Sequence, residues 1–138
     1  MSKEDCIFCK IANGEIPSAT VYETSDFRVI LDINPACKGH ALIIPKEHFD
    51  DIFDMDAVTA GKLFSLATEV ARALKNELHC DGLNIVQNNG EAAGQTVMHF
   101  HLHLIPRMAG DDVKVTWSPK DSNQEELQEL AKALRKRI

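Results

Sequence analysis

The chain lacks the features that mark several large classes of protein. Its 138 residues contain no apolar run near the roughly 20 residues that cross a bilayer, so no transmembrane helix is predicted. The first five residues, MSKED, have no basic segment followed by an apolar one, and we expect no secretory signal. Repeats, low-complexity tracts and linkers are also missing. With 44% hydrophobic and 26% charged residues, the composition is that of one globular domain spanning 1–138.

Positive charge is also scarce. Lys and Arg total 15 against 21 for Asp and Glu, a formal net charge of −6. Because phosphate contacts need clustered cations, neither a nucleic acid nor an anionic membrane surface is an expected partner. A small anionic ligand is still compatible, since a local site can oppose the global charge. Four cysteines without an export signal predict a cytoplasmic protein with free thiols or a metal site in place of disulfides.

The periodicity of apolar residues predicts more strands than helices. The expected strands are 20–23 and 27–32, joined as a hairpin, followed by 40–45, 83–87 and 97–106. A 3.6-residue period predicts a long helix over 56–79 with Asp56 as its N-cap. Ser122 followed by Glu125 fits a capping box that begins a C-terminal helix. Because the strands come in runs and do not alternate with helices, we expect an α+β fold with an antiparallel sheet.

Three of the six histidines alternate with apolar residues in HFHLHLIP at 99–106. On a strand, His99, His101 and His103 would share one face, with about 6–7 Å between neighbours. The apolar residues between them would pack on a helix. Two chemistries fit three aligned imidazoles. One is a metal cluster, and the other is nucleophilic and acid–base work on a phosphorus ester.

The loop before this strand favours the phosphorus chemistry. Gly90 and Gly94 allow backbone conformations closed to other residues, and Gln95 and Thr96 add an amide and a hydroxyl. A glycine-containing loop with exposed N–H groups is suited to phosphate oxygens.

This stretch resembles the histidine-triad (HIT) family of nucleotide hydrolases and transferases, in its HinT-like branch. The family signature, three histidines separated by apolar residues, stands at 99–105, and 94–107 matches the fuller pattern without a gap. Four further blocks agree in order and spacing: CIFCKI at 6–11, LDINP at 31–35, GHALIIPKEH at 39–48 and NNG at 88–90. The resemblance implies an antiparallel sheet of about five strands with a long central helix. It also implies a core at about 6–107 and a tail with a helix at 108–138.

The family's catalytic roles carry over to the matching positions. His101 matches the nucleophile that attacks the α-phosphorus and forms a nucleotidyl-histidine, which water then resolves. His103 matches the histidine that contacts phosphate oxygens and the leaving-group side, and His40 matches a histidine that lies beside the triad in the family. Together with His99, the polar residues Gln95 and Thr96 complete the catalytic candidates. A neutral imidazole is a competent nucleophile near pH 7 if its other nitrogen is held by an acceptor.

The nucleotide-binding candidates follow from the same resemblance. Asp32 matches the carboxylate that accepts both ribose hydroxyls, Asn88 matches a phosphate- or ribose-side amide, and Gly94 belongs to the same nucleotide-binding set. The apolar slot around a purine would be formed by Phe8, Ile11, Ile30, Ile33 and Leu42. A plainer interpretation stays open for each. Asp32 could simply cap the turn before Asn34, and the apolar set could simply be core.

Cys6 and Cys9 have the spacing of a zinc-ligand pair. Two more ligands are needed, and His48 and His99 are the candidates, an assignment that the resemblance supports for some branches of the family. A closed Cys2His2 set would make the zinc structural, with no catalytic metal required. The alternative is two reduced, buried thiols.

These features predict an enzyme that cleaves purine nucleoside 5'-phosphoramidates or related nucleotidyl bonds and releases a nucleoside monophosphate. Three alternatives stay open: a dinucleoside polyphosphate hydrolase, a nucleotide-binding regulator with incidental turnover, and a metalloenzyme that uses the three triad histidines as ligands. The resemblance also implies a homodimer with the helix at 56–79 near the interface.

Overall fold

The strands of this protein form one antiparallel sheet. The computed structural model describes residues 3–138, so Met1 and Ser2, part of the N-terminal stretch considered for a signal, lie outside it. Within the described residues the sheet has five strands in the order β1-β2-β3-β5-β4. The elements are α1 (Ile7–Ala12), β1 (Thr20–Glu23), β2 (Phe27–Leu31), β3 (Ala41–Pro45), α2 (Ala57–Leu78), β4 (Gly82–Val86), a 3-10 turn η1 (Glu91–Ala93), β5 (Leu102–Arg107) and α3 (Gln124–Arg135).

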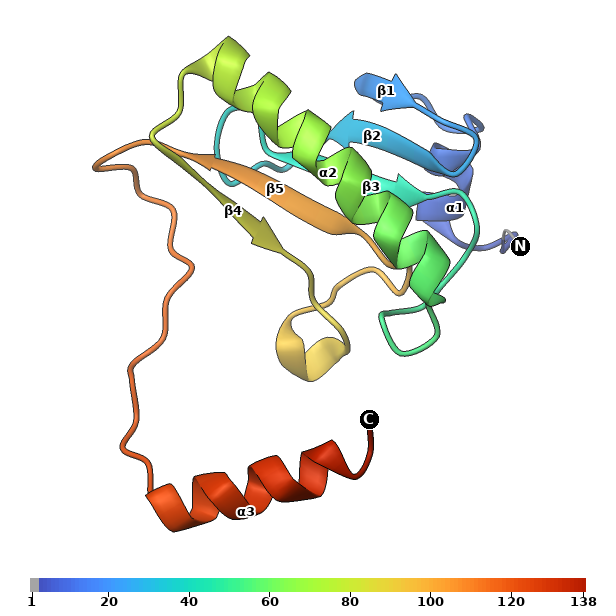
Figure 1. Ribbon diagram of the computed structural model, residues 1–138. Helices are drawn as coiled ribbons and strands as arrows, with labels where there is room; N and C mark the ends of the chain where they lie inside the picture. The colour runs from blue at the N-terminus through green and yellow to red at the C-terminus, as the bar shows by residue number, and fades with distance from the viewer. Residues whose placement is uncertain (1–2) are drawn as a thin grey trace.

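The long helix α2 crosses one face of the sheet and covers the main core (Figure 1). As predicted, Asp56 caps its start and accepts a hydrogen bond from the Thr59 amide at 2.9 Å. The helix ends where His79 adopts a left-handed conformation with φ of 53°. Its apolar stripe and the alternating apolar residues of 100–104 are buried in one cluster. That cluster includes Leu63, Leu66, Ala67, Val70, Phe100, Leu102 and Leu104. The expected α+β fold is confirmed.

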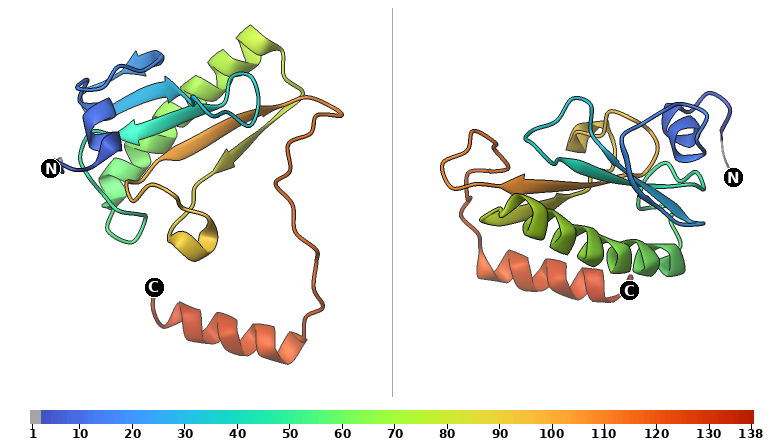
Figure 2. Two further views of the ribbon diagram at one scale, coloured as in Figure 1. Left: turned by 180° about the vertical axis from the view of Figure 1, so that it is seen from behind. Right: turned by 90° about the horizontal axis from the view of Figure 1, so that it is seen from above.

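The opposite face of the sheet carries α1 (Figure 2). There Ile30, Leu42 and Ile44 point away from α2 and form a second cluster with Ala12, against which Phe8 and Ile11 of α1 pack. Alternation of side chains along β2 and β3 therefore supplies both faces with apolar residues. None of the helices among the described residues is long and apolar enough to cross a membrane.

The strand expected at 97–106 begins later than predicted, at Leu102. The backbone pairing of β3 with β5 covers only Leu102 to Leu104, and the residues before Leu102 make other hydrogen bonds. The amide of Phe100 instead donates to the carbonyl of Phe49 at 2.7 Å. His103 is thus the triad member on a strand, and the prediction that all three histidines lie on one strand was wrong.

The C-terminal helix also begins one residue later than the sequence indicated. Asn123, not Ser122, is the N-cap, and its side-chain oxygen accepts from the amide of Glu126 at 3.1 Å. Asn and Ser are nearly equal as N-caps, so a pattern of residue types does not separate the two positions.

Candidate functional site

His101 is held by its own neighbour in the chain. Its Nδ1 lies 2.7 Å from the carbonyl oxygen of His99. Because a carbonyl oxygen only accepts, Nδ1 carries the proton, and the lone pair of the neutral ring is on Nε2. The ring of Phe8 stands edge-on against it at a centroid distance of 4.9 Å. Burial lowers the pKa of His101 and favours the neutral imidazole.

The third histidine is oriented by a chain of hydrogen bonds that starts at a backbone amide. The Ala36 amide donates to Nδ1 of His40 at 2.9 Å, so the proton of the neutral His40 ring is on Nε2. That Nε2 lies 2.9 Å from Nδ1 of His103 and donates to it. His103 therefore carries its own proton on Nε2. Two neighbouring imidazoles thus differ in role, with a lone pair on Nε2 of His101 and an N–H on Nε2 of His103.

Burial keeps the His40 and His103 rings neutral. Burial lowers the pKa of His103 to about 4, and the imidazoles of His101 and His40 act in the same direction. Burial also lowers the pKa of His40, although the Asp32 carboxylate opposes the effect. An Oδ2 atom of Asp32 lies 3.7 Å from His40 Nε2. The site is therefore uncharged on its histidine side at neutral pH.

Asp32 caps the turn after β2, as the plainer interpretation predicts. Its Oδ1 accepts from the Asn34 amide at 2.8 Å, which is the turn-capping bond of the plainer interpretation. Its other oxygen faces the histidine chain. The carboxylate, partly exposed, thus lies at the edge of the site, where its proposed contact with ribose hydroxyls stays a prediction.

The predicted apolar slot is largely assembled. Ile30 and Leu42 are buried, and Phe8 and Ile11 pack against them, so the interpretation as core also holds for the two sheet residues. Ile33 differs, because its side chain is 86% exposed in the turn after β2 and does not belong to this cluster. Four of the five residues lie together, and one of them, Phe8, contacts the His101 ring.

The glycine-containing loop is braced from within by Gln95. Its Oε1 accepts from the Gly90 amide at 2.7 Å, and its Nε2 donates to the carbonyls of Asp50 and Val97. Gln95 is buried and uses both ends of its amide to shape the loop. Its predicted contact with phosphate stays a prediction.

The other polar candidates in this loop differ in exposure. Asn88 is half-buried, with its side chain against Gly94, which has a φ of 96°. Thr96 is exposed, on the same rim as Cys6 and His48. Their predicted phosphate-side roles stay predictions.

Four side chains from distant parts of the sequence converge beside the triad: Cys6, Cys9, His48 and His99. Their sulfur and Nδ1 atoms all lie within 4.8 Å of one another. Nδ1 of His99 is 3.3 Å from Cys6 Sγ and 3.4 Å from Cys9 Sγ, and Cys9 Sγ is 3.3 Å from Nδ1 of His48. All four cysteines of the chain are free.

The partners of the outer ring nitrogens show that this cluster fits a cation. Nε2 of His99 donates to the Pro45 carbonyl at 2.9 Å, and Nε2 of His48 donates to the Asp50 carboxylate at 2.7 Å. Both Nδ1 atoms then present lone pairs, and they lie 3.1 Å apart. Reduced thiols could donate to these nitrogens, but the two facing lone pairs would still repel. Two thiols and two such imidazoles, each oriented by an acceptor, are a donor set that suits Zn²⁺.

The possible metal-ligand groups of the described chain do not include His101. His99 belongs to the cysteine cluster, while His103 groups with His40 and Asp32. The ligand set required by the metalloenzyme alternative, all three triad histidines around one ion, is therefore not assembled. Sequence reasoning missed the Ala36 amide and the Pro45 carbonyl, since backbone groups carry no residue-specific signal. Asp50, two residues after His48, could have been proposed from that spacing.

Comparison with known proteins gives consistent results. A HIT domain family model matches residues 13–110. A crystal structure of a protein from Streptococcus mutans UA159 is 45% identical, covers 99% of this chain and 87% of its own, and superposes with a TM-score of 0.95. Adenosine 5'-monophosphoramidase HNT1 of Saccharomyces cerevisiae is 40% identical over 94% of this chain and 80% of its own length. A Zn-bound histidine triad family protein from Mycobacterium smegmatis is 39% identical, with a TM-score of 0.76 and coverage of 94% and 97%.

The hydrogen-bond chain predicts the tautomers of the two rings. In ¹⁵N NMR spectra, we expect His101 to carry its proton on Nδ1 and His103 on Nε2. Because its pKa is lowered to about 4, His103 should stay neutral from about pH 8 to about pH 5. The variant His40→Asn, which breaks the chain, should lose the Nε2–H preference of His103 and leave His101 unchanged. An Nδ1–H tautomer of His103 in the unmodified protein would contradict the chain.

Proposed function

The chain belongs to the HIT domain family, and from this premise we propose that it hydrolyses purine nucleoside 5'-phosphoramidates or related nucleotidyl bonds. The observation that carries the proposal is the 2.7 Å hydrogen bond from His101 Nδ1 to the His99 carbonyl. It holds the ring and directs the Nε2 lone pair of a neutral imidazole outward as a nucleophile. The yeast relative named as an adenosine 5'-monophosphoramidase supports this substrate class.

In the first step, Nε2 of His101 attacks the α-phosphorus of the substrate. A bond forms between Nε2 and phosphorus, and the bond from phosphorus to the leaving nitrogen breaks. Nε2–H of His103, which stays on its neutral ring, donates a hydrogen bond to a phosphate oxygen, and the departing amine takes its proton from water. This assignment rests on the His40–His103 hydrogen bond, which keeps the His103 proton on Nε2, the ring nitrogen that is not bonded to His40.

In the second step, water attacks the phosphorus of the nucleotidyl-histidine. The new bond from oxygen to phosphorus forms as the bond to Nε2 breaks, and the nucleoside monophosphate leaves. The proton lost by the water is released to solvent, where it neutralises the hydroxide left when the amine was protonated. Splitting one displacement into two gives two lower barriers.

The purine nucleoside would occupy the apolar slot beside α1. Its base would lie against the cluster of Ile30 and Leu42, while Asp32 accepts hydrogen bonds from the ribose hydroxyls. Phe8 contacts both this cluster and the His101 ring, so it would connect the base to the reacting phosphorus. A dinucleoside polyphosphate would use the same slot and the same nucleophile, and would differ in its leaving group.

We further infer that Cys6, Cys9, His48 and His99 bind one structural Zn²⁺. The donor set and the two facing Nδ1 lone pairs support this, as does the likeness to a histidine triad protein described as Zn-bound. When bound, the ion supplies a cross-link and no Lewis acid, because the four side chains complete its tetrahedral coordination. The link would fix His99, whose carbonyl holds His101. Thiolate ligands require a reducing compartment, for which we propose the cytoplasm.

Removal of the nucleophile should abolish turnover. With adenosine 5'-phosphoramidate as substrate, we expect His101→Ala to lower kcat by on the order of 10³-fold or more. Mass spectrometry of samples quenched without acid should detect an AMP adduct on His101 of the unmodified protein and none on the variant. His79→Asn is a matched control, because Asn tolerates the left-handed conformation at this exposed helix end. Equal turnover by His101→Ala and the unmodified protein would exclude this residue as the nucleophile.

Loss of a zinc ligand should affect stability first. We expect one zinc per chain by elemental analysis, and less than half of that in Cys9→Ser. The unfolding temperature of Cys9→Ser should fall by roughly 10 °C or more, because a structural site contributes several kcal/mol. Cys37→Ser is the matched control, since this thiol donates to the Pro106 carbonyl outside the cluster, and a hydroxyl can do the same. Equal zinc content in the two variants would overturn the assignment.

A further inference from the structure

Helix α3 carries an apolar stripe that the described chain, residues 3–138, does not bury. Leu127, Leu130 and Leu134 follow the spacing of one helix face, and each is 45–58% exposed. None of the residues of α3 is buried. A 12-residue helix on its own is marginal in water, because most helical stability comes from packing an apolar face. The stripe therefore needs a surface to pack against.

An apolar groove of suitable character runs along the opposite end of the molecule, between α2 and β1. Two adjoining hollows of about 270 Å³ and 340 Å³ share Val21, Val70 and Ala73 in their walls. Val21 and Tyr22 on the edge strand β1 are 50% and 55% exposed. The groove is thus open, and most of the side chains in its walls are apolar.

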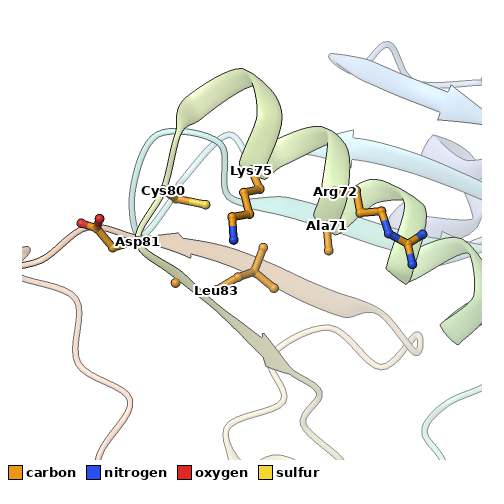
Figure 3. Close-up of a pocket in the computed structure, with 7 residues that line it drawn as sticks. Ala71, Arg72, Lys75, Cys80, Asp81 and Leu83 are labelled. Carbon is orange, nitrogen blue, oxygen red and sulfur yellow. The ribbon is translucent and has the colours of Figure 1, made fainter.

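The other side of α2 is less suitable. The hollow between α2 and β4 is smaller, about 230 Å³, and charged side chains line it, as Figure 3 shows for Arg72, Lys75 and Asp81. Leucine side chains would desolvate these charges without pairing them. The groove beside β1 is therefore the better match for α3.

The root of the tail directs α3 away from this groove in its own chain. The Arg107 guanidinium binds the Asp111 carboxylate through two bonds of 2.8 and 2.7 Å and also donates to the Val113 carbonyl. The same guanidinium holds the pKa of Asp111 far below its usual range. The segment that follows runs extended past β4, and α3 ends beyond the β4 edge of the sheet, whereas β1 forms the other edge (Figure 1).

Charges on the flanks of α3 and on the rim of the groove are complementary. With 100° per residue, Glu126 and Arg135 fall on either side of the leucine stripe, and Arg137 lies just beyond the helix on the Glu126 side. These flanking residues are one acid and two bases. The rim of the groove carries two acids and one base: Glu69, Glu77 and Lys38. Ion pairs could therefore form on both sides of a docked helix.

We propose that α3 of one copy of this chain docks in the groove between α2 and β1 of a second copy, and that two copies exchange their tails in this way. The exchange is reciprocal, because each copy has one tail and one groove, as a two-fold symmetric dimer requires. It covers the stripe and the groove together.

A cysteine pair tests the docking and the identity of the occupant. Leu130→Cys lies in the middle of the stripe, and Ala73→Cys lies in the wall shared by both hollows. Two differently tagged chains, each carrying one substitution, would be co-expressed, mildly oxidised and mapped by mass spectrometry. We expect a disulfide between positions 130 and 73 of different chains. Glu129→Cys, on the opposite face of α3, should give about ten-fold less product, because disulfide geometry is restrictive.

A second measurement detects docking even if the two introduced cysteines are too poorly aligned to form a disulfide. Hydrogen exchange should show protected α3 amides in the unmodified chain. Val21→Asp, in the groove, should raise the exchange rate of these amides ten-fold or more. Ser25→Asp, in the turn after β1, should not. Three results would overturn the proposal: a monomer by light scattering, a 130–73 disulfide formed only when one chain carries both substitutions, or α3 amides that exchange equally fast in all three proteins.

Discussion

The hydrogen bond from His101 Nδ1 to the carbonyl of His99 is the interaction on which the site depends. It determines which nitrogen of His101 carries the lone pair, and it requires that the backbone at His99 be fixed. His99 is fixed by its side chain, which is fully buried and bonded to the Pro45 carbonyl while its other nitrogen faces Cys6 and Cys9. One residue thus serves the proposed metal cluster with its side chain and the proposed nucleophile with its backbone.

The sheet explains why this arrangement is possible. Strand β5 begins only at Leu102, so the backbone of 99–101 is free of the sheet and its carbonyl can accept from a side chain. Phe100 is nevertheless buried in the core beneath α2, and its amide bonds the segment that carries His48. The segment is therefore held by packing and side-chain bonds. His103, two residues on, is held by strand pairing and by His40.

Much of the fold could be predicted from local sequence because local physics decides it. The 3.6-residue period and Asp56 placed α2, and alternation placed the apolar partners of the histidines in the core. The start of β5 was not predictable, because it depends on where the backbone pairing with β3 ends. The same holds for the site. The four side chains of the cysteine cluster could be proposed from spacing and resemblance, and the structure brings them together. The Ala36 amide and the exposure of Ile33 follow from the path of the turn after β2, which residue types do not encode.

The central claim is that the two outward nitrogens of His101 and His103 act on one phosphorus centre. A crystal structure of the protein with AMP tests it most directly. The account predicts that the α-phosphorus lies about 3–3.5 Å from Nε2 of His101, the range of a near-attack position. Nε2 of His103 should then lie about 2.6–3.2 Å from a phosphate oxygen, within hydrogen-bond reach. A phosphate bound away from both nitrogens, with the base outside the slot beside α1, would contradict it.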